Sequence, residues 1–171
     1  MASTWGALDD VVMGGRSESG LFASARGGEH GGPAAVFRGV VTEAGNGGFA
    51  SVRSRNWTPA LNLAGYDGLR LRVRGDGQRY KLTLRCAAAW DGVGYCLSVD
   101  TRPGVWQNVD VPFRDLVPVF RARTSRDSPP FDPLAVSSLQ VMLSKFEYDG
   151  ALNPRVAMGP FELPIESISR A

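Results

Sequence analysis

Short apolar segments separated by glycine and proline run through the whole sequence and restrict the folds it can adopt. The 171 residues include 21 glycines and 11 prolines, and no long segment keeps the ~3.6-residue apolar period of an amphipathic helix. Residues 61–64 and 113–117 have room for one helical turn each. Short segments bounded by turn residues are typical of β-sandwiches and barrels. The sequence therefore predicts an all-β sandwich of about eight strands, at residues 34–41, 48–54, 68–74, 79–86, 94–100, 105–111, 138–144 and 160–165.

Length and composition are typical of one folded domain. Hydrophobic residues make up 43% of the chain and charged residues 21%, which is ordinary for a globular protein. No apolar run approaches the ~20 residues that span a bilayer, so no transmembrane segment is expected. No targeting peptide is recognisable either. We expect residues 1–171 to be a single β-sandwich domain of a larger protein.

The clearest local signal is the alternation of apolar and cationic residues on both sides of Asp76-Gly77, in residues 68–85 (GLRLRVRGDGQRYKLTLR). Asp-Gly between two such runs favours a two-residue β-hairpin, because glycine accepts a positive φ. In this hairpin Arg74 lies opposite Arg79 and Arg72 opposite Lys81, and like charges across a ladder are destabilising. The alternation places six side chains in the core: Leu69, Leu71, Val73, Tyr80, Leu82 and Leu84.

The cations of this hairpin are predicted to form one outward-facing surface. Two interpretations stay open: a solvated charged face with carboxylates from neighbouring strands, or a surface that binds RNA phosphates or an acidic protein. In either case we expect Arg72→Glu with Lys81→Glu to leave the fold intact. Trp57, Trp90, Trp106 and Tyr80 are candidates for stacking on bases, although the alternation places Tyr80 in the core. A long loop supplies further arginines, so the candidate RNA-binding residues are Arg70, Arg72, Arg74, Arg79, Lys81, Arg85, Arg121, Arg123 and Arg126.

Residue types that carry catalysis or bind metals are sparse. The one histidine, His30, has glycine neighbours and is expected to be an exposed loop residue. Cys86 and Cys96 form no metal or redox motif, so free buried thiols are expected. Asp9 and Asp10 suit an acid–base pair or a hard cation, but a solvated turn is more typical of such a glycine-rich segment. The sequence therefore predicts no catalytic residues, no metal, no cofactor and no enzymatic activity.

Five motifs follow one another along the chain: residues 5–17 (WGALDDVVMGGRS), 46–53 (NGGFASVR), 66–77 (YDGLRLRVRGDG), 106–113 (WQNVDVPF) and 160–163 (PFEL). Together they resemble the signatures of the complex I intermediate-associated protein domain family, over nearly the whole chain. Arg16 departs from the small or aliphatic residue usual at its position. The resemblance implies a galactose-binding-like jelly-roll sandwich, which agrees with the strand pattern.

Three further segments are similar to a plastid branch of that family: residues 28–33 (GEHGGP), 120–124 (FRART) and 143–154 (LSKFEYDGALNP). In this branch, the high-chlorophyll-fluorescence translation factors, the domain interrupts an atypical short-chain dehydrogenase-like Rossmann domain. The resemblance implies a chloroplast location, in the stroma or on thylakoids, and a role in photosystem II biogenesis. It also implies that the protein promotes translation of the mRNA for a photosystem II reaction-centre subunit. The other branch implies assembly of respiratory complex I in mitochondria.

Three binding functions therefore stay open. The domain is expected to bind mRNA, protein partners in a translation or assembly complex, or both. The alternatives are a protein-interaction module of a complex I assembly factor and a carbohydrate-binding sandwich, the last resting on fold analogy. If the domain is inserted in a parent Rossmann-like domain, its two ends are expected to leave the sandwich close to each other. Trp5 and Ile168 are then expected to be neighbours.

Overall fold

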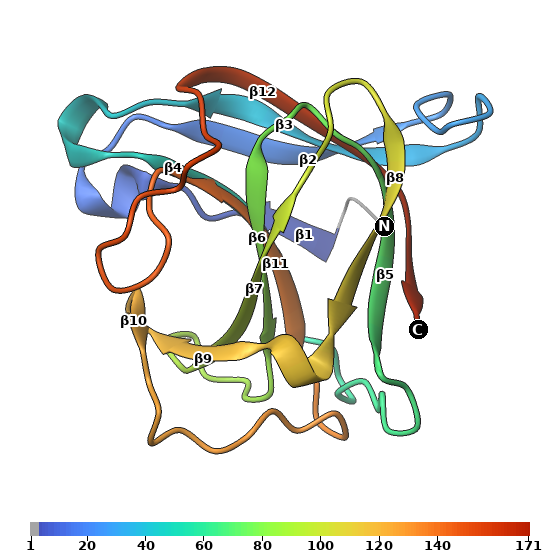
Figure 1. The fold of residues 1–171 in the computed structure, drawn as a ribbon, viewed down its shortest axis with the longest axis vertical. Helices are drawn as coiled ribbons and strands as arrows, with labels where there is room; N and C mark the ends of the chain where they lie inside the picture. The colour runs from blue at the N-terminus through green and yellow to red at the C-terminus, as the bar shows by residue number, and fades with distance from the viewer. Residues whose placement is uncertain (1–3) are drawn as a thin grey trace.

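The computed structural model describes residues 4–171 as two antiparallel β-sheets packed face to face (Figure 1). Sheet A has seven strands in the order β1-β4-β11-β6-β7-β9-β10, and sheet B has five in the order β2-β3-β12-β5-β8. Helical structure in the described residues is limited to the 3₁₀ turns η2 (Asp10–Met13), η3 (Ala44–Asn46) and η4 (Phe113–Asp115). The predicted all-β sandwich is confirmed.

All eight predicted strands are present, four of them with the predicted bounds. Four additional strands, β1, β2, β9 and β10, were not predicted. Sheet A contains β1 (Trp5–Ala7), β4 (Phe49–Ser54), β6 (Arg79–Arg85), β7 (Gly94–Asp100), β9 (Val117–Phe120), β10 (Arg123–Thr124) and β11 (Ser138–Ser144). Sheet B contains β2 (Glu18–Ser24), β3 (Ala34–Val41), β5 (Gly68–Arg74), β8 (Trp106–Pro112) and β12 (Gly159–Arg170). Among residues 4–171, no helical element has the length and hydrophobicity needed to cross a membrane.

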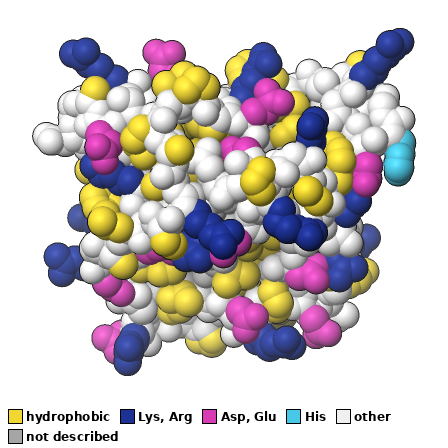
Figure 2. Space-filling model, turned by 45° about the horizontal axis from the view of Figure 1, so that its top comes forward, with side chains coloured by type: hydrophobic (Ala, Val, Ile, Leu, Met, Phe, Trp, Pro, Cys, Tyr) yellow, Lys and Arg dark blue, Asp and Glu magenta, His cyan; other side chains and the backbone are white. Residues whose placement is uncertain are grey.

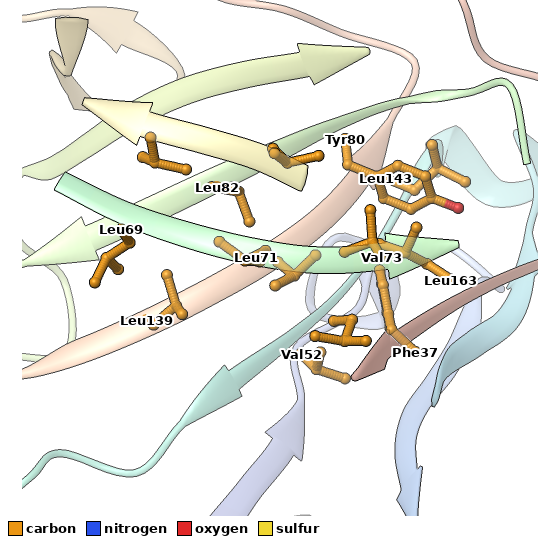
Figure 3. Close-up of a cluster of buried hydrophobic side chains, with 14 of the residues drawn as sticks. Phe37, Val52, Leu69, Leu71, Val73, Tyr80, Leu82, Leu139, Leu143 and Leu163 are labelled. Atoms are coloured by element: carbon orange, nitrogen blue, oxygen red, sulfur yellow. The ribbon is translucent and has the colours of Figure 1, made fainter. Parts of the chain in front are cut away.

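The core fills the space between the two sheets (Figure 3). Alternate residues of each strand point inward, and Phe37 lies at the centre of an aromatic group. Its ring packs edge-on against Phe161 at 4.9 Å and Tyr80 at 6.2 Å between centroids. The six side chains that the alternation assigned to the core are all buried, so this prediction is confirmed: Leu69, Leu71, Val73, Tyr80, Leu82 and Leu84.

The predicted hairpin at Asp76-Gly77 is wrong, because β5 and β6 belong to different sheets. β5 pairs with β12 and β8, whereas β6 pairs with β11 and β7. Gly77 does adopt a positive φ of 89°, and Asp76 accepts hydrogen bonds from the Gln78 amide at 3.1 Å and the Tyr80 hydroxyl at 2.7 Å. Gly77 therefore supplies the positive φ that was expected of it, but the chain bends there to cross the sandwich and does not return along the same sheet.

The two ends of the described chain come together at one side of the sandwich. Trp5 of β1 and Ile168 of β12 line the same apolar cavity of about 700 Å³, together with Trp57. The prediction that Trp5 and Ile168 are neighbours is confirmed. This arrangement is compatible with insertion into another domain, which stays a proposal.

Candidate binding surfaces

The structure divides the predicted basic surface between two opposite sheets. Arg70, Arg72 and Arg74 project from β5 on the outer face of sheet B, whereas the cations of β6 project from sheet A. The predicted like-charge pairs do not form: Arg72 lies opposite Asn108 and Ser167. In sheet A, Arg79, Lys81 and Arg85 lie opposite Asp100, Ser98 and Ser138.

Most of these cations have a partner within the fold. Arg70 binds Asp110 at 2.6 Å, Arg72 binds Glu29 at 2.6 Å, and Arg79 binds Asp100 at 2.6 Å. Hydrogen bonds from the two guanidiniums of Arg70 and Arg79 lower the pKa of Asp110 and of Asp100, respectively. Figure 2 shows the same mixing, with Lys and Arg side chains interspersed among acidic and hydrophobic ones. Arg74 alone of the β5 arginines has no ion-pair partner among the described residues.

The arginines of the β9–β10 region lie at the far edge of sheet A. Arg121, at φ 49°, and Ala122, at φ 62°, form the tight turn between the two strands. Arg121 binds Asp91 at 2.6 Å, and this contact brings it beside Trp90, whose side chain is 70% exposed. Arg123 and Arg126 are exposed. The structure therefore joins one of the three loop arginines, Arg121, to the residue that follows Trp90 in sequence.

The remaining aromatic candidates are less accessible. Tyr80 is buried, as the alternation predicts. Trp57 and Trp106 are half-buried. Trp106 lines a surface groove of about 460 Å³ on sheet B, with Phe22, Arg38, Arg74 and Glu162 among the other residues that line it.

Asp9 and Asp10 are structural anchors, so the expected solvated turn is wrong. Asp10 is 0% exposed and accepts hydrogen bonds from the Ser17 hydroxyl at 2.6 Å, the Ser17 amide at 2.9 Å, and the Gly48 and Phe49 amides at 2.7 and 3.2 Å. Burial alone would raise the pKa of Asp10, but these hydrogen bonds outweigh burial and lower it. The carboxylate of Asp10 thereby joins three parts of the chain, which are its own turn, Ser17 and residues 48–49.

Asp9 completes this anchor from the other side of the same turn. Its carboxylate accepts hydrogen bonds from the Ser19 hydroxyl at 2.6 Å, the Ser19 amide at 2.8 Å and the Ser51 amide at 2.9 Å. A Cβ at Gly15 or Gly47 would collide with the Asp10 carboxylate. The glycines of the first two motifs therefore leave room for a buried acid, and the motifs define a structural clamp.

The clamp presents three apolar side chains to solvent. Val11, Val12 and Met13 follow Asp10 within η2 and are 62%, 78% and 65% exposed. Gly14 ends the turn at φ 86°, and its amide donates to the Val11 carbonyl at 3.0 Å. We call Val11, Val12 and Met13 the apolar tip. Figure 1 shows η2 on the same side of the molecule as the segment between β11 and β12, in which Phe146 and Leu152 are also exposed.

The other chemistry-bearing residues show no assembled site. His30 is exposed, as predicted. Cys96 is buried and Cys86 is half-buried, both are free, and burial raises the pKa of each thiol. Within residues 4–171, no group of three or more His, Cys, Asp or Glu side chains is arranged to hold a metal ion.

Comparison with known families decides what kind of chain this is. Residues 1–165 match the model of the Complex I intermediate-associated protein 30 family. The chain belongs to this family. No curated protein matches the sequence. The family assignment agrees with the resemblance in the five motifs, and Asp9, Asp10 and their glycines explain two of those motifs physically.

Solved structures show where else this fold occurs. The chain is similar to the family 11 carbohydrate-binding module of a cellulosomal cellulase from Clostridium thermocellum, with a TM-score of 0.66 at 12% identity over 98% of this chain and 86% of that one. The same module in complex with a β-1,3-1,4-mixed-linked tetrasaccharide gives a TM-score of 0.62 at 12% identity, over 98% and 88%. An exo-β-agarase gives a TM-score of 0.55 at 11% identity, over 100% of this chain and 23% of the agarase chain. These likenesses show that the chain has the sandwich fold of these modules.

Proposed function

We propose that this chain is a non-catalytic docking module that binds a protein partner through the apolar tip. The observation that carries this proposal is the exposure of three consecutive large apolar side chains, Val11, Val12 and Met13, at 62%, 78% and 65%. They stand on a turn fixed by the buried Asp10 carboxylate. Exposed apolar groups held by a rigid scaffold are typical of interaction sites.

Rigidity makes the tip an efficient docking element. A turn that is already ordered loses little conformational freedom when it binds. Burying a Val or Met side chain completely stabilises a complex by about 1.5–3 kcal/mol. The clamp of Asp9 and Asp10 therefore supplies order, and the tip supplies contact area.

A more specific setting is a plastid factor that promotes photosystem II biogenesis and translation of a reaction-centre mRNA. The plastid-like segments at residues 28–33, 120–124 and 143–154 support this setting. In that setting the domain is part of a longer chloroplast protein with a Rossmann-like domain, and the neighbouring ends at Trp5 and Ile168 suit an insertion. The alternative is a mitochondrial assembly factor of respiratory complex I, which the family description supports.

RNA binding is a second candidate, and the contact between Arg121 and Asp91 favours it. This 2.6 Å ion pair joins Arg121, from the loop that carries Arg123 and Arg126, to the residue that follows the exposed Trp90. An exposed aromatic ring next to cations is the combination that stacks on unpaired bases and contacts phosphates. Carbohydrate binding rests on the fold likeness and on the groove with Phe22 and Trp106, and glycan screening tests it.

Replacement of two residues of the tip tests the docking proposal in the parent protein. Val12→Asp with Met13→Asp places two charges where an apolar contact forms. The side chains point to solvent, so the fold is retained and thermal stability changes little. We expect the parent protein to stop co-migrating with its assembly complex on a native gel.

Leu134→Asp is the matched control, because Leu134 is another exposed apolar residue, at 60%, outside the tip. It is expected to leave co-migration unchanged. Full co-migration of the folded tip variant would contradict protein docking through the tip. In that case, loss of RNA association after Arg123→Glu with Arg126→Glu would favour the second candidate.

A further inference from the structure

Two arginines cross over strand β11 on the outer face of sheet A. Arg53 of β4 is in register with Gln140, and Arg85 of β6 is in register with Ser138. Their side chains lean the opposite way, since Arg53 Nε donates to Ser138 Oγ and Arg85 Nη2 donates to Gln140 Oε1, both at 3.3 Å. The two guanidiniums are thereby brought together. Burial and then the charge of Arg85 lower the pKa of Arg53.

Lys81 lies on the same outer face, four residues before Arg85 on β6 and about 13 Å from it along the strand. Its Nζ donates to the Phe146 carbonyl at 3.1 Å and lies 4.5 Å from the centre of the Tyr148 ring. Lys81 is therefore apart from the two arginines. We call Arg53, which is buried, and Arg85, which is half-buried with a buried Nε, the buried cation cluster.

The buried cation cluster lacks matching carboxylates. Among the described residues, neither of its two members forms an ion pair. Asp91 lies close enough to Arg85 to favour its charged form, but it binds Arg121 at 2.6 Å. The cluster therefore differs from Arg70, Arg72 and Arg79, each of which has its own carboxylate.

Neutral groups supply the contacts that carboxylates usually make. The segment at residues 86–93 lies over the arginines, where the Trp90 carbonyl accepts from Arg53 Nη1 at 3.2 Å and the Gly92 carbonyl accepts from Arg85 Nη1 at 2.8 Å. The Arg53 guanidinium also lies 5.1 Å from the centre of the Trp90 ring. Arg85 Nε is buried and has no hydrogen-bond partner among the described residues. Adjacent buried charges without a counter-charge are costly, so a negative ligand would stabilise this face.

We propose that the buried cation cluster binds a compact oxyanion, a phosphate or a carboxylate group of a small ligand. Arginine presents planar pairs of N–H donors that match both groups. The bound oxyanion accepts a hydrogen bond from Arg85 Nε. It also supplies a negative charge, which the neutral carbonyls of Trp90 and Gly92 do not. The site is separate from the apolar tip.

Titrations with inorganic phosphate and with glucuronate test the site and show whether it prefers a phosphate group or a carboxylate group. Tryptophan fluorescence reports on Trp90, with Trp90→Phe identifying its share of the signal. Sodium chloride at equal ionic strength and neutral glucose are the control titrations. We expect saturable binding of at least one of the two oxyanions, and an increase in thermal stability at saturation. The preferred oxyanion identifies the ligand class.

Arg85→Gln is expected to weaken this binding at least tenfold. Arg79→Gln is the matched control, because Arg79 lies on the same face of the same strand but is paired with Asp100, and it is expected to leave affinity unchanged. If Arg85→Gln does not fold, the Arg85 Nε–H resonance of the unaltered protein decides, since it shifts when the N–H donates a hydrogen bond to the oxyanion. No saturable response to either oxyanion, or equal affinity in Arg85→Gln, would overturn the proposal. Neither result bears on docking through the apolar tip, because the tip is a separate site. Val12→Asp is correspondingly expected to leave oxyanion binding unchanged.

Discussion

Asp10 holds three segments together because its carboxylate accepts hydrogen bonds from Ser17, Gly48 and Phe49. Its neighbour Asp9 makes the corresponding contacts to Ser19 and Ser51. From the sequence, both acids were plausible as solvated or catalytic residues, because two adjacent carboxylates do not by themselves indicate burial. The glycines beside them were the available signal, because a buried acid needs neighbours without side chains.

Asp10→Asn is predicted to lower the free energy of unfolding by about 3 kcal/mol, because it removes a buried charge-assisted network. The folded-state pKa of Asp10 is lowered from the usual 3.8, so its contribution is present above that pH and is lost as pH falls below it. Chemical denaturation at neutral and acidic pH measures both effects. The acid-induced loss of stability shrinks in Asp10→Asn. Asp67→Asn, at an exposed carboxylate, serves as control, and equal stability of the two variants would contradict the clamp.

Lys81→Glu is predicted to destabilise the fold by about 2 kcal/mol, because it places a carboxylate against the Phe146 carbonyl and the Tyr148 ring. Arg72→Glu instead breaks a half-exposed ion pair with Glu29. It is expected to lower the free energy of unfolding by about 1 kcal/mol or less. The expectation that both reversals leave the fold intact stays a prediction for Arg72, and we revise it for Lys81, because Lys81 is half-buried and contacts Phe146 and Tyr148. Thermal denaturation of the two single variants distinguishes them, and the reverse ranking would refute this explanation.

At the scale of elements, alternation and turn residues predicted strands well and their partners poorly. The side-chain direction of β5 and β6 follows from a two-residue period, which local sequence contains. Their assignment to different sheets depends on β12, almost a hundred residues away, which pairs with β5. Strand β2 was missed because Gly20 and its serines interrupt the apolar pattern. It lies at an edge of sheet B, and none of its residues is fully buried.

Engineered disulfides test the corrected strand pairing. Arg72→Cys with Asn108→Cys joins directly opposed residues of β5 and β8, whose Cα atoms lie about 4.5–5.5 Å apart in an antiparallel ladder. We expect this pair to oxidise readily in the folded protein. Arg72→Cys with Lys81→Cys, the pair that the hairpin would bring together, is expected to remain reduced. Mass spectrometry of peptides identifies the bonds, and the opposite pattern would restore the hairpin.

At the scale of the whole molecule, the binding surfaces were predicted only in part. Nine cations were singled out, and the structure distributes them over both sheets. Arg53 was missed, since it precedes Ser54 in an apolar strand and nothing local marks it as the neighbour of Arg85. The apolar tip lies inside a recognised motif, but its exposure follows from burial of Asp10. Clusters of this kind depend on long-range packing, which one sequence does not display.

RNA binding by the isolated chain is predicted to be weak and to have a shallow salt dependence. Four of the nine candidate cations already bind carboxylates, Arg70, Arg72, Arg79 and Arg121, and each free phosphate contact adds about one to the slope of log affinity against log salt. A titration with short single-stranded RNA at two salt concentrations measures this slope. A slope as steep as that of a protein contacting many phosphates would favour RNA as the principal partner.

Hydrogen exchange of the parent protein, free and in its native assembly complex, tests docking through the apolar tip most directly. The amides of Val11 to Met13 lie in a short 3₁₀ turn with exposed side chains, so they are expected to exchange quickly in the free protein. We predict slower exchange across residues 10–14 in the complex and unchanged exchange at residues 86–93 and 121–126. Unchanged exchange at the tip, with protection at those two loops instead, would contradict the proposal.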